Sequence, residues 1–123
     1  MSFDFNHGHD IPLPAAGDLS AKQYRFVTLN SSGQIAASTR GALSCGVLQD
    51  KPAAAGRSGA VRYNGVTKIK LGGSVTAGNA IVSDANGDGV TTASSDTNYM
   101  GIALESGASG EIVAMLLQPR GLS

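Results

Sequence analysis

One turn of the chain carries oxygen ligands at the spacing of a calcium loop. Asp84, Asn86 and Asp88 occur at every second residue, and Gly89 takes the sixth position, where such a loop turns sharply. The twelfth position, a bidentate glutamate in a calcium loop, is Ser95 here. Asn-Gly and Asp-Gly steps are also ordinary hairpin chemistry. We therefore expect a turn and no metal site, with Asp84, Asn86 and Asp88 as a weak cation candidate.

Two histidines lie close together near the N-terminus, in His7-Gly8-His9-Asp10. A transition metal would need further ligands, and no neighbouring cysteine or third histidine completes a tetrahedral set. Nucleophilic catalysis through Ser44 or Cys45 has no base elsewhere, because these are the only histidines in the chain. We expect no catalytic constellation and no cofactor.

Three short motifs faintly resemble, in order, those of trimeric dUTP-hydrolysing enzymes: Ala16-Gly17-Asp18-Leu19, Arg57-Ser58-Gly59 and Asn98-Tyr99-Met100-Gly101. The aspartate that should precede the tyrosine motif and activate water is missing, as is the Gly-rich C-terminal phosphate clamp. Short Gly-containing matches arise easily in a chain with 17 glycines. We therefore expect that the protein is not an enzyme.

The elements that position these residues follow a pattern that occurs twice. Gly46-Val47-Leu48-Gln49-Asp50 is matched about 55 residues later by Gly101-Ile102-Ala103-Leu104-Glu105. Upstream of these segments lie matching turns, Asn30-Ser31-Ser32-Gly33 and Asp84-Ala85-Asn86-Gly87. A solenoid needs three or more repeats, so a period used twice predicts two similar β-units that close against each other.

Composition narrows the possible partners. The 123 residues make one domain, and nine basic residues balance nine acidic ones without a basic run, so we expect no nucleic-acid or membrane partner. No apolar stretch is long enough to span a membrane, and we see no signal peptide at the N-terminus. Charged residues are 15% of the chain, against about 25% in ordinary domains. We expect other subunits or a partner to cover much of so sparsely charged a surface.

Short alternating segments bounded by Gly, Asn, Asp or Ser predict an all-β domain over residues 21–123, a small β-barrel or sandwich of two related halves. Asn64-Gly65 carries the signal of a tight hairpin. The first strand candidate begins at Gln23, and the others are Gln34–Ser38, Leu43–Gln49, Gly59–Tyr63, Val66–Leu71, Asn79–Ser83, Gly89–Thr92, Met100–Leu104 and Glu111–Leu117.

Residues 1–20 differ from the rest, and we expect them to form an extended N-terminal arm. Pro12 and Pro14 exclude a central strand, and the segment has no sustained periodicity. A disordered terminus is one alternative. The other is an arm that orders on a partner, pressing apolar side chains into grooves or adding a strand to an exposed edge. The candidate contacts are four apolar residues, Phe3, Phe5, Ile11 and Leu13, and three acidic ones, Asp4, Asp10 and Asp18.

Several segments together resemble a family of small tailed-phage capsid decoration proteins, also called cement proteins. They are Gln23-Tyr24-Arg25-Phe26-Val27, Gly46-Val47-Leu48-Gln49-Asp50-Lys51-Pro52, Gly65-Val66-Thr67-Lys68, Gly101-Ile102-Ala103-Leu104-Glu105, Gly110-Glu111-Ile112-Val113 and Leu117-Gln118-Pro119-Arg120-Gly121. The resemblance covers roughly residues 15–121. It implies a β-rich, commonly trimeric protein on the outside of the expanded phage head, with an N-terminal arm that reaches capsid subunits.

From this resemblance we expect a homotrimer in the virion, on the capsid exterior, assembled in the host cytoplasm. Its partner would be the major capsid protein, and it would stabilise the expanded head by binding across capsomer joints. We also expect deletion of residues 1–17 to leave a folded trimer that no longer binds heads. The alternative is a surface-exposed receptor- or glycan-binding β-module, against which the lack of tryptophan and the aromatic content of 5% both argue.

Overall fold

The computed structural model describes residues 8–92 and 98–117, and in these residues every regular element is a β-strand. The strands are β1 (Gly8–Pro14), β2 (Phe26–Leu29), β3 (Ile35–Ala37), β4 (Gly46–Leu48), β5 (Ser58–Lys70), β6 (Ala80–Ser83), β7 (Gly89–Thr91), β8 (Gly101–Ala103) and β9 (Ile112–Leu117). The prediction of an all-β fold is confirmed. The described part of the chain contains no helix that could span a membrane.

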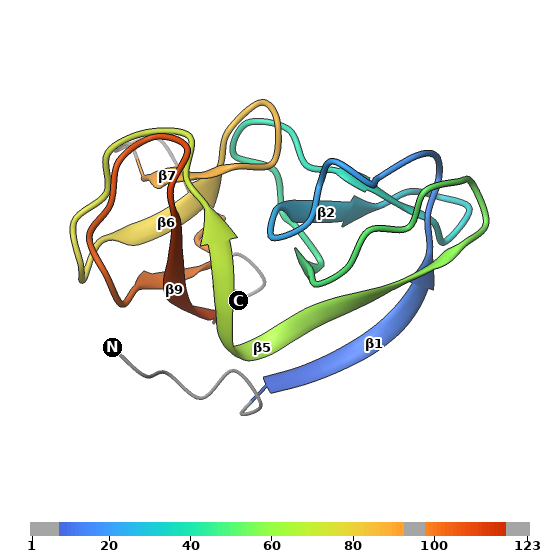
Figure 1. Ribbon diagram of the computed structural model, residues 1–123, viewed down its shortest axis with the longest axis horizontal. Helices are drawn as coiled ribbons and strands as arrows, with labels where there is room; N and C mark the ends of the chain where they lie inside the picture. The colour runs from blue at the N-terminus through green and yellow to red at the C-terminus, as the bar shows by residue number, and fades with distance from the viewer. Residues whose placement is uncertain (1–7, 93–97, 118–123) are drawn as a thin grey trace.

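The strands form one antiparallel sheet that curls into an open half-barrel. Its order is β3-β2-β4-β5-β9-β8-β6-β7, and β1 pairs beside this path with β5. Figure 1 shows two lobes side by side, with the long strand β5 running from one into the other. The two lobes therefore share a continuous backbone.

The two lobes repeat the same strand pairing. In the first, β2 lies between β3 and β4, and in the second, β6 lies between β7 and β8. The register agrees to the residue, because Val27 faces Gly46 in the first lobe as Ile81 faces Gly101 in the second. The predicted pair of related halves is confirmed.

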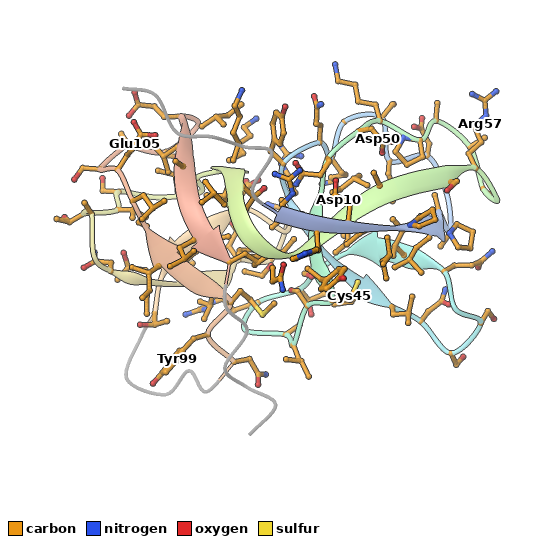
Figure 2. All side chains as sticks on the ribbon, turned by 90° about the horizontal axis from the view of Figure 1, so that it is seen from below. Asp10, Cys45, Asp50, Arg57, Tyr99 and Glu105 are labelled. Atoms are coloured by element: carbon orange, nitrogen blue, oxygen red, sulfur yellow. The ribbon has the colours of Figure 1, made fainter. Side chains whose placement is uncertain are left out.

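Contacts outside the strands repeat as well. Ala15 forms a parallel bridge with Ile35, as Leu71 does with Gly89. The strand β1 is thus the counterpart of the C-terminal part of β5, so residues 8–14 of the first half correspond to residues 64–70 of the second. Two acidic side chains also occupy equivalent positions. The Asp50 carboxylate accepts a hydrogen bond from the N–H of Ala60 at 3.1 Å, and the Glu105 carboxylate accepts one from the N–H of Ala114 at 2.8 Å. Figure 2 shows them in separate halves, along the same edge of the view.

Each half has its own apolar core. One cluster consists of first-half residues, namely Ala15, Leu19, Val27, Ile35, Leu48 and Val61. The other is built mainly from the second half, around Ile69, Ile81 and Met115, but it also takes in Phe26 and Val47 from the first. Burial of these two side chains therefore fixes the halves to each other, at roughly 1.5–3 kcal/mol for each fully buried large apolar group.

The predicted hairpin at Asn64-Gly65 is wrong. Both residues lie inside β5, which continues through them for 13 residues. Gly65 has a φ of 97°, in the left-handed region that favours glycine, and at this point the partners of β5 change from β1 and β4 to β9. Gly65 therefore allows the strand to bend, as Figure 1 shows, and the chain does not reverse direction there.

The described part of the predicted arm is extended but packs within its own chain. Residues Gly8–Pro14 pair with β5, and the residues that follow bury Ala15 and Leu19 in the first core. Deletion of residues 1–17 would remove this strand and Ala15, so we withdraw the expectation that the truncated protein folds. Phe3, Asp4 and Phe5 lie outside the described residues.

Candidate functional site

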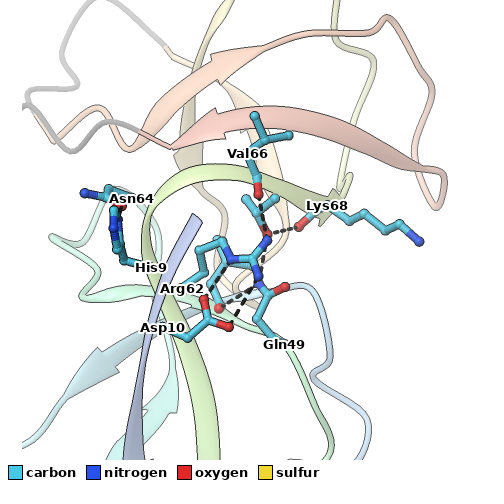
Figure 3. Close-up of polar contacts among 9 residues, drawn as sticks. His9, Asp10, Gln49, Arg62, Asn64, Val66 and Lys68 are labelled. Carbon is cyan, nitrogen blue, oxygen red and sulfur yellow. Dashed lines mark hydrogen bonds and ion pairs between the residues drawn. The ribbon is translucent and has the colours of Figure 1, made fainter. Parts of the chain in front are cut away.

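The acidic candidate Asp10 is engaged within the fold. Its carboxylate forms a fork with Arg62 of β5, at 2.7 Å from Nε and 3.3 Å from Nη2. Arg62 also donates a hydrogen bond at 2.8 Å to the carbonyl oxygen of Val66, beyond the bend of β5 (Figure 3). Only 11% of the Arg62 side chain and 33% of the Asp10 side chain are exposed. This pair joins β1 to the crossing between the halves, so the Asp10 carboxylate already has a partner within its own chain.

Further polar contacts surround this crossing. A nitrogen of His9 (Nδ1) lies 2.6 Å from the amide oxygen of Asn64, and the His9 ring stacks on Tyr63 with centroids 6.0 Å apart. On the other side, Gln49 donates a hydrogen bond at 2.8 Å to the buried hydroxyl of Thr67. His9 is therefore held by its own chain, and among the described residues it belongs to no cluster of three side chains able to hold a metal ion. His7 lies outside the described residues.

The other described arm candidates divide into buried and exposed. Leu13 packs against the core of the first half, so its side chain already has an apolar contact within its own chain. Ile11 and Asp18 are exposed. Hydrogen bonds from the Ser20 hydroxyl and from the Ser20 N–H, at 2.9 Å, lower the pKa of the Asp18 carboxyl.

The outer edge of β1 resists strand addition. Among the described strands β1 pairs with β5 alone, so its other edge carries no partner. Ala15 directs its N–H toward β5, bonding the carbonyl of Arg57 at 2.8 Å. Because N–H groups alternate along a strand, Pro12 and Pro14 present their nitrogens at the outer edge, where they have no hydrogen to donate. Strand addition, one of the two binding modes expected for the arm, is therefore disfavoured here.

The candidate cation turn uses its oxygen atoms for the fold. The Asp84 carboxylate accepts hydrogen bonds from the N–H groups of Asn86 at 2.8 Å and Asp88 at 3.0 Å. Asn30 makes the same turn in the first half, with the N–H groups of Ser32 and Gln34, both at 2.9 Å. The Asp88 carboxylate lies 2.5 Å from Nε of Arg25, which belongs to the other half. The described residues contain no cluster of three or more side chains able to hold a metal ion.

A shallow surface hollow in the first half was not predicted. It is lined by Leu29, Leu43, Ser44 and Cys45. The Cys45 thiol lies 3.4 Å from the carbonyl oxygen of Val27, and burial raises its pKa, which keeps it protonated at neutral pH. The signal that could have revealed the hollow is in the repeat, because apolar Leu29 aligns with the polar residue Ser83 of the second half.

Comparison with known proteins identifies the fold and the family. The family model described as phage cement protein matches residues 5–117. The chain belongs to the phage cement protein family. It is thus a structural protein associated with the phage head, in agreement with the resemblance seen in the sequence. No curated protein matches the chain.

The fold of this cement protein also occurs in a solved structure. The crystal structure of the head fiber gp8.5 N base of bacteriophage phi29 is similar, with a TM-score of 0.72 over 94% of this chain and 98% of that one. Sequence identity is 15%, so the likeness concerns the fold.

Proposed function

We propose that this cement protein binds the outside of the expanded head across capsomer joints and stabilises the shell without catalysing a reaction. Its partner is the major capsid protein, and it acts as a homotrimer. The observation that carries the proposal is the family match over residues 5–117, which spans both halves of the fold.

The architecture suits a clamp. A filled head is under outward load, and a protein that bridges a joint must transmit tension through its own body. Here β5 passes through both halves, and its backbone pairs with β1, β4 and β9. Pulling the halves apart would also expose Phe26 and Val47, which are buried in the core shared with the second half. The shared strand and the shared core therefore both oppose separation of the halves.

The capsid contacts of the proposal come mainly from the residues before β1, with one further carboxylate after it. Phe3 and Phe5 supply apolar side chains and Asp4 supplies a carboxylate. Asp10 and Leu13 leave the set of contacts because the fold uses both. Asp18 stays in the set as an exposed carboxylate. Three such arms on a trimer would raise a modest single-arm affinity by roughly 10²–10⁴ through effective concentration.

Stabilisation of the shell is tested by heating expanded heads with and without the protein. We expect saturating protein to raise the midpoint of heat-induced DNA release, because a ligand that binds only the intact shell stabilises it by mass action. At about 100 times the dissociation constant the gain is about 2.7 kcal/mol for each occupied site. Heads that are fully decorated yet release DNA at the unchanged temperature would contradict the proposed role.

A further inference from the structure

Most of the large apolar side chains exposed in the described residues belong to the first half, while Tyr99 and Ile112 belong to the second. The four of the first half are Ile11, Leu29, Leu43 and Tyr63, with exposed fractions of 41%, 50%, 39% and 40%. They come from β1, β2, the segment before β4, and β5. Two border the hollow beside Cys45. Exposure alone does not make these residues a binding surface, so the repeat is needed to show what they have in common.

The repeat gives each of these residues a counterpart. The registers of the two halves align Ile11 with Thr67, Leu29 with Ser83 and Tyr63 with Leu117. Leu43 corresponds to Asn98, because each lies three residues before the equivalent glycines Gly46 and Gly101. Thr67, Ser83 and Leu117 are 0% exposed. The same face of the repeat is thus buried in the second half and open in the first.

The first half itself covers that face of the second half. Gln49 donates to the hydroxyl of Thr67 at 2.8 Å, and the N–H of Gly41 donates to the carbonyl of Ser83 at 2.9 Å. The amide of Asn98 in turn donates to the Gly41 carbonyl at 3.0 Å. Leu117 shares its core cluster with Phe26 and Val47 of the first half.

This contact between the halves is head to tail. The first half contributes one surface, formed by Phe26, Gly41, Val47 and Gln49, which we call the donor surface. The second half contributes the face that it covers, formed by Thr67, Ser83, Asn98 and Leu117, which we call the acceptor face. These two names refer to the surfaces and not to the direction of hydrogen bonds. A two-fold arrangement would use the same surface on both sides. The acceptor face of the first half and the donor surface of the second are therefore left without a partner among the described residues.

The two unused surfaces match in chemistry. The counterparts of Phe26, Val47 and Gln49 in the second half are Ala80, Ile102 and Leu104, all partly exposed. Where Gln49 meets Thr67 as a polar pair inside the chain, Leu104 would meet Ile11 as an apolar pair. The sizes of the side chains are also complementary. Inside the chain the donor surface has the large Phe26 and the acceptor face the small Ser83, whereas between copies the donor surface would have the small Ala80 and the acceptor face the large Leu29.

We propose that Ile11, Leu29, Leu43 and Tyr63 bind a second copy of this chain, through the Ala80, Ile102 and Leu104 surface of its second half. The contact between copies repeats the one between the halves. A head-to-tail contact of this kind either closes into a ring or continues as an open chain, whereas a single isologous contact stops at two copies. The inference deepens the proposed function and rests on its homotrimer, which would then be a closed ring of six halves.

The test is the mass of the full-length protein in solution, measured by light scattering without heads. Leu29→Asp and Ile102→Asp each place a charge in the proposed contact, on opposite sides. We expect wild type to be a trimer and each variant to dissociate at least 100-fold more readily, because an unpaired charge would be buried. Ile112→Asp, at a residue 51% exposed on β9, is the control and should leave the trimer intact. Leu104→Asp replaces Ile102→Asp if circular dichroism shows that the latter does not fold.

Mixing separates a head-to-tail contact from a two-fold one. Leu29→Asp keeps the donor surface and Ile102→Asp keeps the acceptor face, so an equimolar mixture should form dimers and nothing larger. A monomeric wild type, a wild-type dimer, or a Leu29→Asp protein with wild-type mass would each overturn the proposal. Because no head takes part, a trimer that fails to bind heads would refute the proposed function and leave this inference standing.

Discussion

Replacing Gly46 or Gly101 with alanine is expected to destabilise the fold by about 3 kcal/mol, and by similar amounts at the two sites. A Cβ on Gly46 would collide with the carbonyl oxygen of Arg62, and one on Gly101 with that of Leu116. These oxygens belong to paired strands, so relieving the collision means separating backbones. Neither glycine has a positive φ, so the cost is steric.

Urea denaturation followed by circular dichroism measures both effects. Gly17→Ala is the matched control, because a Cβ there would have no atom within 4 Å, and it should change the free energy of unfolding by less than about 0.5 kcal/mol. A costly Gly101→Ala beside a neutral Gly46→Ala would contradict the equivalence of the halves.

Two truncations are expected to separate head binding from folding. A protein lacking residues 1–7 should fold, because it retains β1 and the Asp10–Arg62 pair. Its affinity for expanded heads should fall by at least 100-fold, since Phe3, Asp4 and Phe5 are gone and the loss is multiplied over three arms. A protein lacking residues 1–17 should not fold cooperatively, because the paired length of β1 and buried Ala15 are lost.

Circular dichroism and sedimentation with expanded heads give the two readouts. Substituting both Phe3 and Phe5 by serine provides a full-length control that should behave like the shorter truncation. Wild-type head affinity in the protein lacking residues 1–7 would show that the capsid contact lies elsewhere. Cooperative unfolding of the longer truncation would show that β1 is dispensable for the fold.

The repeated halves were predictable because close backbone approach leaves a mark in the sequence. Where two strands approach too closely for a Cβ, glycine is required, and this happens at Gly46 and at Gly101. The turns at Asn30 and Asp84 mark the repeat for a similar reason, since each needs a side-chain oxygen that accepts local N–H groups.

The course of β5 was not predictable from local signals. Asn64-Gly65 is compatible with a reversal or with a bend, and the choice depends on partners far away in sequence, β1 and β9. The same holds for β1, whose two prolines suit an outer edge and fit an arm equally well. The hollow at Leu29 was not predictable either, because the contrast between exposed Leu29 and buried Ser83 depends on the first-half segment that covers Ser83.

Co-sedimentation of the purified protein with expanded and unexpanded heads tests the cement function most directly. The proposed function predicts saturable binding to expanded heads, by three chains at each site, and no binding to unexpanded ones. Equal binding to both shells would contradict a role in the expanded head. Binding to neither would contradict the capsid partnership itself and favour a receptor- or glycan-binding module.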